Sequence, residues 1–462
     1  MIFSVVIVLE ILLSYLVKTF WGLSNITQFL LVCINTVIFL FLMNKNQKMT
    51  KRQKIILILA LLTRIGLLLV DEFIHRIPFN SGDADRFDEM ATQIANDMGL
   101  LKSEEYLYGG MYSKLLGILY YAMGNARFFA QSINVFLGMG TIYLLFYLLN
   151  TRKFKTQKVE LFLEILIAFF PFTILFSICL LRESIMIFLI IFSLKTCIDY
   201  IESKKVYPIL ISFVSVILAT TFHSGNIFII IGYVLIFSFY EQEEKKFGAS
   251  FKNIMKCFVV TCIIIAINMM FSNVLANKFT RQIKNNNKIE NQVDTAHESI
   301  TQTTHEMKQT QKQSKFQMIL KNNPITKAIE TTARGDSAYI GGRTVNNFAQ
   351  FVLYSMEKVF YFMFSPLPWD WRGLTDALVF LMDSMLYIIF LIDTLFHIRK
   401  QNKTNGLILL FLVFGIALSI ALYSIGTFNA GTALRHRHKF LYYIIILNVL
   451  THTKKESEEM NA

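Results

Sequence analysis

The sequence contains few charged residues for its length. Of its 462 residues, 17% are Asp, Glu, Lys or Arg, whereas 54% are hydrophobic. A soluble chain carries about a quarter charged residues. Several apolar runs of about twenty residues match the thickness of a bilayer, and together with the scarcity of charge they exclude an ordinary soluble protein. We therefore expect an all-α fold, a polytopic transmembrane helical bundle with about eleven to thirteen spans.

Other common signals are also missing. The sequence has five cysteines, all within or beside apolar runs, and none has the spacing of metal ligands. The first apolar run, Ile2 to Tyr15, lacks a basic n-region and a small-residue cleavage site, which favours a retained helix over a signal peptide. No internal repeat is visible.

The formal charge of +13 does not imply a nucleic-acid partner, because much of it lies in short loops between apolar runs. Such loops are cytoplasmic, and anionic lipid phosphates of the bilayer are the natural partner for their charge. The loop between the second and third runs is the strongest example, and its basic residues are Lys45, Lys48, Lys51, Arg52 and Lys54. The next span must then end outside the cell, which places the residues after it on the outer face.

Hydropathy and charge divide the chain into five segments. Residues 1–53 form a transmembrane hairpin with a basic cytoplasmic loop, and residues 54–275 form a transmembrane module whose loop 73–127 is external and acidic. Residues 276–345 are a long polar external loop with too few apolar residues to build a core. Residues 346–451 form a C-terminal transmembrane module, and residues 452–462 a cytoplasmic tail.

Two segments are expected to lie along the membrane surface. Residues 109–124 are short and flanked by glycine, so we interpret them as a surface or re-entrant helix. The run 348–364 either crosses the bilayer or stays at the outer surface. The second reading is preferred, because it leaves the basic residues after 396 in the cytoplasm.

The stretch Pro78–Met90, PFNSGDADRFDEM, contains four carboxylates within seven residues. Its apolar spacing predicts a short amphipathic helix with Phe87, Met90 and Ile94 on one side. Asp83 and Asp85 are either a solvated helix boundary or the acidic part of a site. Two carboxylates at this spacing suit a general base, or a divalent metal such as Mg²⁺ or Mn²⁺.

Further polar residues gather on the same predicted face. Arg182 and Glu183 lie between two apolar hairpin arms with almost no loop, where ionisable groups are costly unless they are partnered. They form either a local ion pair that staples the turn or part of a site. His223 is a lone histidine, and an interfacial structural role is the simpler interpretation.

The C-terminal half contributes the remaining candidates. Arg435 and Arg437, in RHRHK, lie on the side that short basic loops avoid, and they suit bidentate binding of lipid-linked phosphate. Trp369, in PLPWDW, is either an interface anchor or a platform for a sugar ring. We also include Arg182, His223, Arg334 and Arg372 among the residues expected to bind substrate or phosphate.

Several of these segments resemble one family of membrane enzymes. The aspartate pair after an early span, the stretch YSKLLGILYYAMGN, residues 170–189 (FPFTILFSICLLRESIMIFL) and the late ALRHRHKF are similar to features of GT-C glycosyltransferases. The resemblance implies a polyprenyl-phosphate-linked sugar as donor and Asp83 as catalytic base or metal-proximal acid. It implies, more weakly, that Asp85 and Glu183 are supporting acids.

The expected function is transfer of a sugar from that donor to a cell-surface glycan or lipid-linked acceptor at the extracytoplasmic face of the plasma membrane. The first alternative is an O-antigen or capsule-type polysaccharide polymerase, which uses the same donor type. The second is a transporter or flippase, but that class has polar or broken helices at the bilayer midplane. Here the midplanes are mostly Leu, Ile and Phe, which favours an enzyme.

Overall fold

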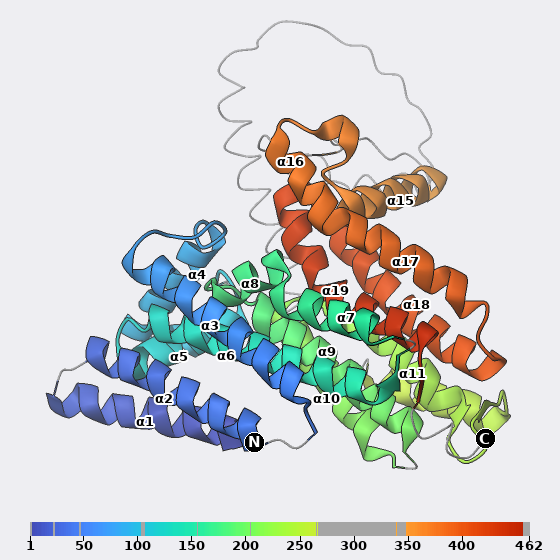
Figure 1. The fold of residues 1–462 in the computed structure, drawn as a ribbon, viewed down its shortest axis with the longest axis horizontal. Coiled ribbons are helices and arrows are strands. Elements are labelled where there is room, and N and C mark those ends of the chain that lie inside the picture. The colour runs from blue at the N-terminus through green and yellow to red at the C-terminus, as the bar shows by residue number, and fades with distance from the viewer. Residues whose placement is uncertain are drawn as a thin grey trace, which may run out of the picture. The chain divides into compact units, whose positions relative to one another are not determined.

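The computed structural model describes residues 2–21, 24–45, 48–102, 107–154, 156–203, 205–264, 266, 339 and 348–455. These residues are almost entirely helical, as the sequence predicts (Figure 1). They divide into two compact units. The first comprises Met1–Gly248, Met385–Ser419 and Arg435–Ala462, and the second comprises Ala249–Ser384 and Ile420–Leu434.

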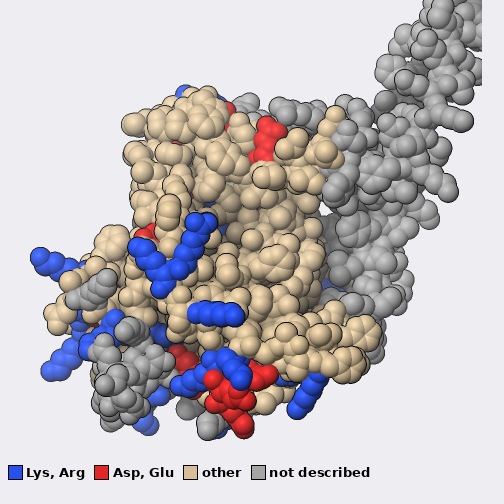
Figure 2. Space-filling model, turned by 90° about the vertical axis from the view of Figure 1, so that its right-hand side faces the viewer, with Lys and Arg blue, Asp and Glu red and all other residues tan. Residues whose placement is uncertain are grey.

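Six helical segments in the described part of the chain are long and apolar enough to cross a membrane. They are Ile26–Lys45, Arg127–Asn150, Gln157–Ile178, Glu183–Glu202, Leu374–Ile398 and Lys403–Ile425. Two shorter apolar helices, Tyr207–Phe222 and Ser224–Phe239, follow the fourth segment. On the face shown in Figure 2, most of the surface is uncharged and the Lys and Arg side chains gather mainly in its lower half.

The N-terminal part of the first unit contains long helices and a short helical pair, α4 and α5. The bounds are α1 Ile2–Trp21, α2 Ser24–Lys45, α3 Lys51–Phe73, α4 Asp83–Asn96, η1 Met98–Lys102, α5 Met111–Met123 and α6 Arg127–Asn150. Helix α1 packs on α2 and α5, α4 packs on α5, and α3 packs on α6. The segment 109–124, expected to be a short surface or re-entrant helix, is the thirteen-residue helix α5.

The middle of the first unit contains two helical hairpins. The bounds are α7 Gln157–Phe169, α8 Pro171–Ile178, α9 Glu183–Glu202, α10 Tyr207–Phe222, η2 Ser224–Phe228 and α11 Ile229–Phe239. Two antiparallel ladders, β1 Arg152–Lys153 with β4 Lys454–Lys455 and β2 Tyr240–Glu241 with β3 Lys246–Phe247, join neighbouring ends. The sequence predicts turns near 177–184 and 222–226, and both are confirmed.

Three long helices follow, α17 (Met385–Ile398), α18 (Lys403–Ile425) and α19 (Ala430–His452), and of these α19 is buried over most of its length within the first unit. From Phe440 to Leu447 every α19 side chain is at most 3% exposed. A helix that is apolar on all sides is stable only when protein or lipid surrounds it. Tyr442 Oη donates a 2.7 Å hydrogen bond to the Ile167 carbonyl, and Tyr387 Oη donates a 3.0 Å hydrogen bond to the Arg437 carbonyl.

Local sequence explains where α3 begins. Thr50 Oγ1 accepts a 3.2 Å hydrogen bond from the Gln53 amide, and Gln53 Oε1 accepts one from the Thr50 amide, which completes a capping box. Arg52 then binds Glu164 of α7 through two hydrogen bonds of 2.8 and 3.1 Å. The first turn of α3 is thus fixed to α7, in the hairpin that follows α6.

Helix α4 begins at the acidic stretch because Gly82 adopts a φ of +65°, which other residues rarely adopt. Asp83 and Asp85 occupy the first helical turn, where the helix dipole favours negative charge. Phe87 and Ile94 are buried as the apolar spacing predicts, whereas Met90 remains half-buried. This packing against α5 turns the start of α4 toward the polar residues described below.

The second unit contains α15 Phe348–Phe364, η3 Pro368–Asp370, α16 Leu374–Val379 and η4 Phe380–Ser384. Its most unusual side chain is Lys358, which is fully buried and donates to the Thr427 carbonyl. The Lys358 ammonium lies 3.6 Å from the centre of the Phe428 ring. The expected external loop 276–345 lies outside the described residues apart from Tyr339. The five predicted segments, the run 348–364 as a surface helix and the total number of spans stay predictions.

Candidate functional site

Two carboxylates and two basic side chains meet inside the first unit. We call Asp83, Glu183, Arg435 and Lys439 the ion cluster. Arg435 Nη1 lies 2.5 Å from Asp83 Oδ2, and Arg435 Nε lies 3.2 Å from Glu183 Oε1. Lys439 Nζ lies 3.5 Å from the same Glu183 oxygen. Arg435 and Lys439 share one face of α19 because residues four apart in a helix lie one above the other.

The cluster is largely shielded from water. The side chains of Glu183 and Lys439 are 1% and 0% exposed, and that of Arg435 is 15% exposed, whereas Asp83 is 30% exposed. Neither oxygen of Glu183 meets a donor of the described residues with hydrogen-bond geometry. A buried carboxylate held by charge, without a full set of hydrogen bonds, retains capacity to accept a proton or a donor from a ligand.

Asp83 is the most accessible member of the cluster. Its second carboxylate oxygen accepts a hydrogen bond from Tyr108 Oη, so the two oxygens have different partners. Burial is the largest single influence on the pKa of Asp83 and raises it, but Arg435, Tyr108 and Arg182 together outweigh burial and lower the pKa below its ordinary value. Burial and the bond to Asp83 raise the pKa of Tyr108 to about 12. Asp83 is therefore ionised and Tyr108 is neutral at neutral pH.

Arg182 and His223 lie at the edge of the cluster. Arg182 Nη1 donates a 2.9 Å hydrogen bond to the Phe222 carbonyl, and its charge acts on both Asp83 and Glu183. The sequence left open a local ion pair between Arg182 and Glu183. In the structure Glu183 pairs with Arg435 of α19. His223 Nδ1 accepts from the Gly225 amide at 3.2 Å, and its ring centre is 5.3 Å from that of His436.

Asp85 belongs to a different network. It contacts Arg76 and lies 3.2 Å from Arg127 Nη1, and the same guanidinium nitrogen lies 3.0 Å from Asp88 Oδ2. Arg127 Nη2 donates a 3.1 Å hydrogen bond to the Asn80 carbonyl. Asp85 thus fixes the loop before α4 against α6. Its carboxylate and that of Asp83 have different partners.

Amide side chains stabilise the break between α8 and α9 that positions Glu183. Asn134 Nδ2 donates 2.8 Å hydrogen bonds to the carbonyls of Cys179 and Leu181. Gln131 Nε2 donates a 2.9 Å hydrogen bond to the Ile178 carbonyl. Asn80 Oδ1 accepts from the Leu180 amide at 3.0 Å. These bonds satisfy backbone groups that the helices leave unpaired, since unsatisfied buried carbonyls and amides are costly.

The remaining predicted residues lie elsewhere. Arg437 is fully buried, and its guanidinium lies over the Tyr387 ring, 5.7 Å from the ring centre. It faces away from Arg435 because two residues of a helix span about 200° of rotation. Trp369 and Arg372 belong to the second unit. Trp369 is 67% exposed, and Arg372 Nε pairs with Asp376 at 3.1 Å. Arg334 lies outside the described residues.

The predicted metal pair, Asp83 and Asp85, is divided between separate guanidinium partners. Cations already neutralise both carboxylates, so the residues do not offer the joint oxygen ligands that Mg²⁺ or Mn²⁺ requires. The metal requirement stays a prediction that a chelator can test.

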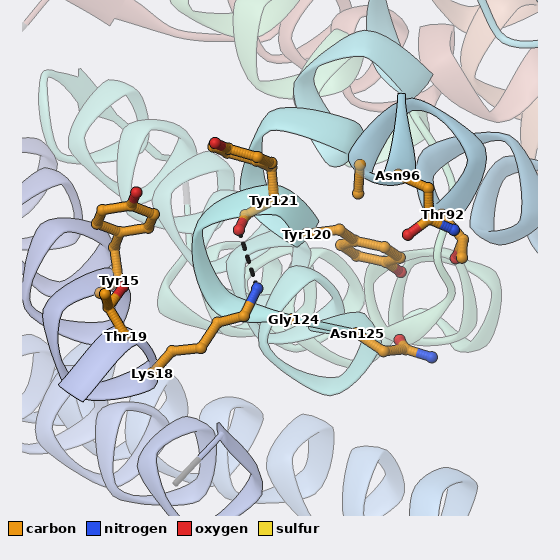
Figure 3. A pocket seen from close by; sticks show the side chains of 10 residues that line it. Tyr15, Lys18, Thr19, Thr92, Asn96, Tyr120, Tyr121, Gly124 and Asn125 are labelled. Carbon is orange, nitrogen blue, oxygen red and sulfur yellow. Dashed lines mark hydrogen bonds between the residues drawn. The ribbon is translucent and has the colours of Figure 1, made fainter. Parts of the chain in front are cut away.

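A cavity of about 400 Å³ opens between α1, α4 and α5, at the C-terminal end of α4 (Figure 3). Lys18 crosses it and donates a 3.1 Å hydrogen bond to the Tyr121 carbonyl. Its lining residues are Tyr15, Lys18, Thr19, Thr92, Ala95, Asn96, Tyr120, Tyr121, Gly124 and Asn125. Tyr120 connects the cavity to the Arg127 network, because its hydroxyl donates a 2.5 Å hydrogen bond to Asp88. Aromatic rings, amides and hydroxyls are groups that suit sugar hydroxyls.

Sequence reasoning did not single out Tyr108, Arg127 and Lys439 as site residues. The spacing of Lys439 indicates its position, because a residue four after Arg435 in a helix lies on the same face. Arg127 begins α6 directly after a turn, which resembles an ordinary helix boundary. Tyr108 lies in a loop with no periodic pattern.

Comparison of the chain with models of protein families, with characterised proteins and with solved structures finds no match. The arrangement of side chains is therefore what bears on function. That arrangement offers an ionised, partly accessible carboxylate, a second buried carboxylate and several cations in one place. It suits a reaction in which a hydroxyl loses a proton while a phosphate leaves.

Proposed function

We propose that the chain is an integral membrane glycosyltransferase that uses a polyprenyl-phosphate-linked sugar. The observation that carries the proposal is the meeting of Asp83, Glu183 and Arg435, which come from α4, α9 and α19. Three segments distant in sequence thus supply an acid, a second acid and a guanidinium to one place. Ionisable groups are costly to bury in an apolar protein even when they are paired, so such a cluster is a functional-site candidate by default.

The reaction proceeds by attack of an acceptor hydroxyl on the anomeric carbon of the donor sugar. The new carbon–oxygen bond forms as the bond to the donor phosphate breaks, and polyprenyl phosphate leaves with the electron pair. The hydroxyl proton passes to a carboxylate of the cluster, for which Asp83 is our first candidate because it is the more accessible. Attack opposite the leaving group inverts the anomeric configuration.

Arg435 has two tasks in this scheme. Without substrate it neutralises Asp83 and Glu183, which otherwise repel each other within a shielded site. A donor phosphate competes for the guanidinium, because arginine binds phosphate oxygens in the same bidentate way as carboxylate oxygens. Transfer of Arg435 toward the phosphate raises the basicity of Asp83 at the moment when a base is required. Lys439 then keeps Glu183 neutralised.

We place this site at the extracytoplasmic end of the bundle, on the basis of the positions of the basic loops. Lys48, Lys51, Arg52 and Lys54 lie just before and in the first turn of α3, and the length of α3 separates them from α4. The cavity of Figure 3 is then our candidate binding region for a glycan acceptor. Thr92 lies about 13 Å along α4 from Asp83, so the cavity suits a part of the acceptor distant from the reacting hydroxyl.

The two alternatives are a polymerase and a transporter. A polymerase joins whole lipid-linked repeat units and yields a ladder of products, whereas a transferase adds one sugar per event. A transporter moves the lipid-linked sugar without breaking its anomeric bond. The shielded carboxylate Glu183 at the end of a span favours chemistry over transport.

The decisive experiment is a transfer assay with purified protein in lipid nanodiscs, a radiolabelled polyprenyl-phosphate sugar and a glycan acceptor extract. Transfer shows as water-soluble labelled glycan that appears together with polyprenyl phosphate. Translocation of intact donor across liposomes without cleavage would support the transporter alternative. A product ladder would support the polymerase.

A further inference from the structure

Three side chains of metal-ligand type gather at the other end of α19 from the ion cluster. Asp393 and His397 lie one turn apart on α17, and His452 lies at the C-terminal end of α19. Their ligand atoms lie within 4.8 Å of one another. In the part of the chain that the structure describes, no other three His, Cys, Asp or Glu side chains meet in this way. All three belong to the first unit.

Neighbouring groups hold these side chains in place. Asn448 Nδ2 donates a 2.6 Å hydrogen bond to Asp393 Oδ2, and it lies one turn before His452 on α19. His397 Nδ1 lies 2.9 Å from the backbone carbonyl of Asp393 and 3.1 Å from Oδ1 of its carboxylate. When that nitrogen donates its proton to the carbonyl, Nε2 retains a lone pair. Metal-binding histidines are oriented in this manner, with the second ring nitrogen bound to a carbonyl or carboxylate.

The cluster is compact and open to water. The centres of the His397 and His452 rings are 4.0 Å apart, and His452 Nε2 contacts Asp393 Oδ2 directly. The side chains of His397, Asp393 and His452 are 28%, 37% and 33% exposed. An ion can therefore enter without unfolding of the surrounding helices.

We propose that Asp393, His397 and His452 bind a divalent transition metal ion, with Zn²⁺ as the best match. Two imidazole nitrogens and a carboxylate oxygen are a Zn²⁺ ligand set that leaves a fourth position for water. Bonds of about 2.0–2.1 Å to a tetrahedral ion place ligand atoms about 3.3 Å apart, so the three side chains need only small rotations. Mg²⁺ and Ca²⁺ fit less well because they prefer an all-oxygen shell.

The ion would join α17 to the last turn of α19. His452 lies about 25 Å along α19 from Arg435, so the metal contacts no residue of the ion cluster. Its role is structural, since it fixes the helix that carries Arg435 and Lys439. This inference is independent of the proposed sugar transfer.

The test uses the full-length protein in detergent, purified without a polyhistidine tag and stripped with a chelator. Zn²⁺ binding is measured by titration calorimetry, and Co²⁺ is used as a spectroscopic probe of the coordination. We expect one equivalent of Zn²⁺ on the wild type and a visible Co²⁺ absorption of a site with nitrogen and oxygen ligands. The variants His452→Ala and Asp393→Asn should lose at least tenfold in affinity.

His75→Ala is the matched control, because His75 is exposed and lies outside the cluster. It should bind Zn²⁺ as the wild type does. A second readout guards against misfolding: Zn²⁺ should raise the Tm of the wild type and of His75→Ala, but not that of His452→Ala. The proposal is overturned if the wild type binds no Zn²⁺, or if His452→Ala and Asp393→Asn bind it as tightly as the wild type.

Discussion

Arg435 Nη1 of α19 lies 2.5 Å from Asp83 Oδ2 at the start of α4. The same guanidinium reaches Glu183, so one arginine joins two carboxylates from different helices. Such an arrangement lowers the repulsion between the two acids and fixes all three helices relative to one another. Removal of any member should therefore affect both stability and activity, and suitable variants can separate the two effects.

Arg435→Ala should destabilise the protein by about 3 kcal/mol, because it leaves the buried carboxylate of Glu183 with Lys439 as its remaining ion partner. Addition of Glu183→Gln to this variant should restore about 1 kcal/mol or more, since the uncompensated charge disappears. The measurement is a double-mutant cycle by chemical unfolding in detergent. Arg372→Ala, which breaks an exposed pair with Asp376, is the control and should cost at most about 1 kcal/mol. Strict additivity of the two changes would contradict the described pairing.

The stability contributed by Asp83 should depend on pH in one direction. Its folded pKa lies below the ordinary value of 3.8, so the contribution is complete above that value and declines as the pH falls toward the folded pKa. The difference in Tm between the wild type and Asp83→Asn should be constant from about pH 5 to 8 and shrink below about pH 4. A difference that grows as the pH falls would have the opposite sign and would exclude an ionised Asp83.

Gly232 allows α11 and α18 to approach closely. A Cβ on Gly232 would lie 2.3 Å from the Phe411 carbonyl oxygen, so Gly232→Ala should force the helices apart and cost about 1–3 kcal/mol. Gly66→Ala is the control, since an added Cβ there meets no atom within 4 Å. It should be neutral, or stabilising by about 0.5–1 kcal/mol through helix propensity. Equal effects of the two substitutions on Tm would show that the contact between α11 and α18 is looser than described.

The cavity between α1, α4 and α5 predicts a separation of kinetic effects. Tyr121→Ala and Lys18→Ala should raise the KM for a glycan acceptor by about threefold to tenfold and leave kcat nearly unchanged. These side chains would contact a part of the acceptor that binds equally well in the ground state and in the transition state. Leu115→Ala, an exposed position of α5 outside the cavity lining, is the control. An unchanged KM in both cavity variants would remove the cavity from the acceptor path.

The sequence predicts the all-α class and the presence of membrane-length apolar helices, because apolar length is a local signal. It also predicts that Asp83, Glu183 and Arg435 share one end of the bundle, since topology alone places them there. It does not predict that Asp83 pairs with Arg435 while Asp85 pairs with Arg127, because both carboxylates lie in the same helical turn. That choice depends on how α4 is rotated by the packing of Phe87 and Ile94.

Other features depend on tertiary contacts. Arg435 and Arg437 form one basic motif in the sequence, yet helical geometry directs them to opposite faces of α19. The role of Tyr108 depends on a loop without periodic pattern. The sequence does not predict the cluster of Asp393, His397 and His452, because one of its three members, His452, comes from the end of a different helix.

The most direct test of the central claim is the transfer of sugar from a polyprenyl-phosphate donor by purified Asp83→Asn, compared with the wild type and with Glu89→Gln. Glu89 is an exposed acid of the same helix and is the matched control. Loss of a general base costs about 10²–10⁴-fold in rate, so Asp83→Asn should lose at least about a hundredfold in kcat while Glu89→Gln retains activity. Equal rates of transfer by the wild type and Asp83→Asn would contradict the account.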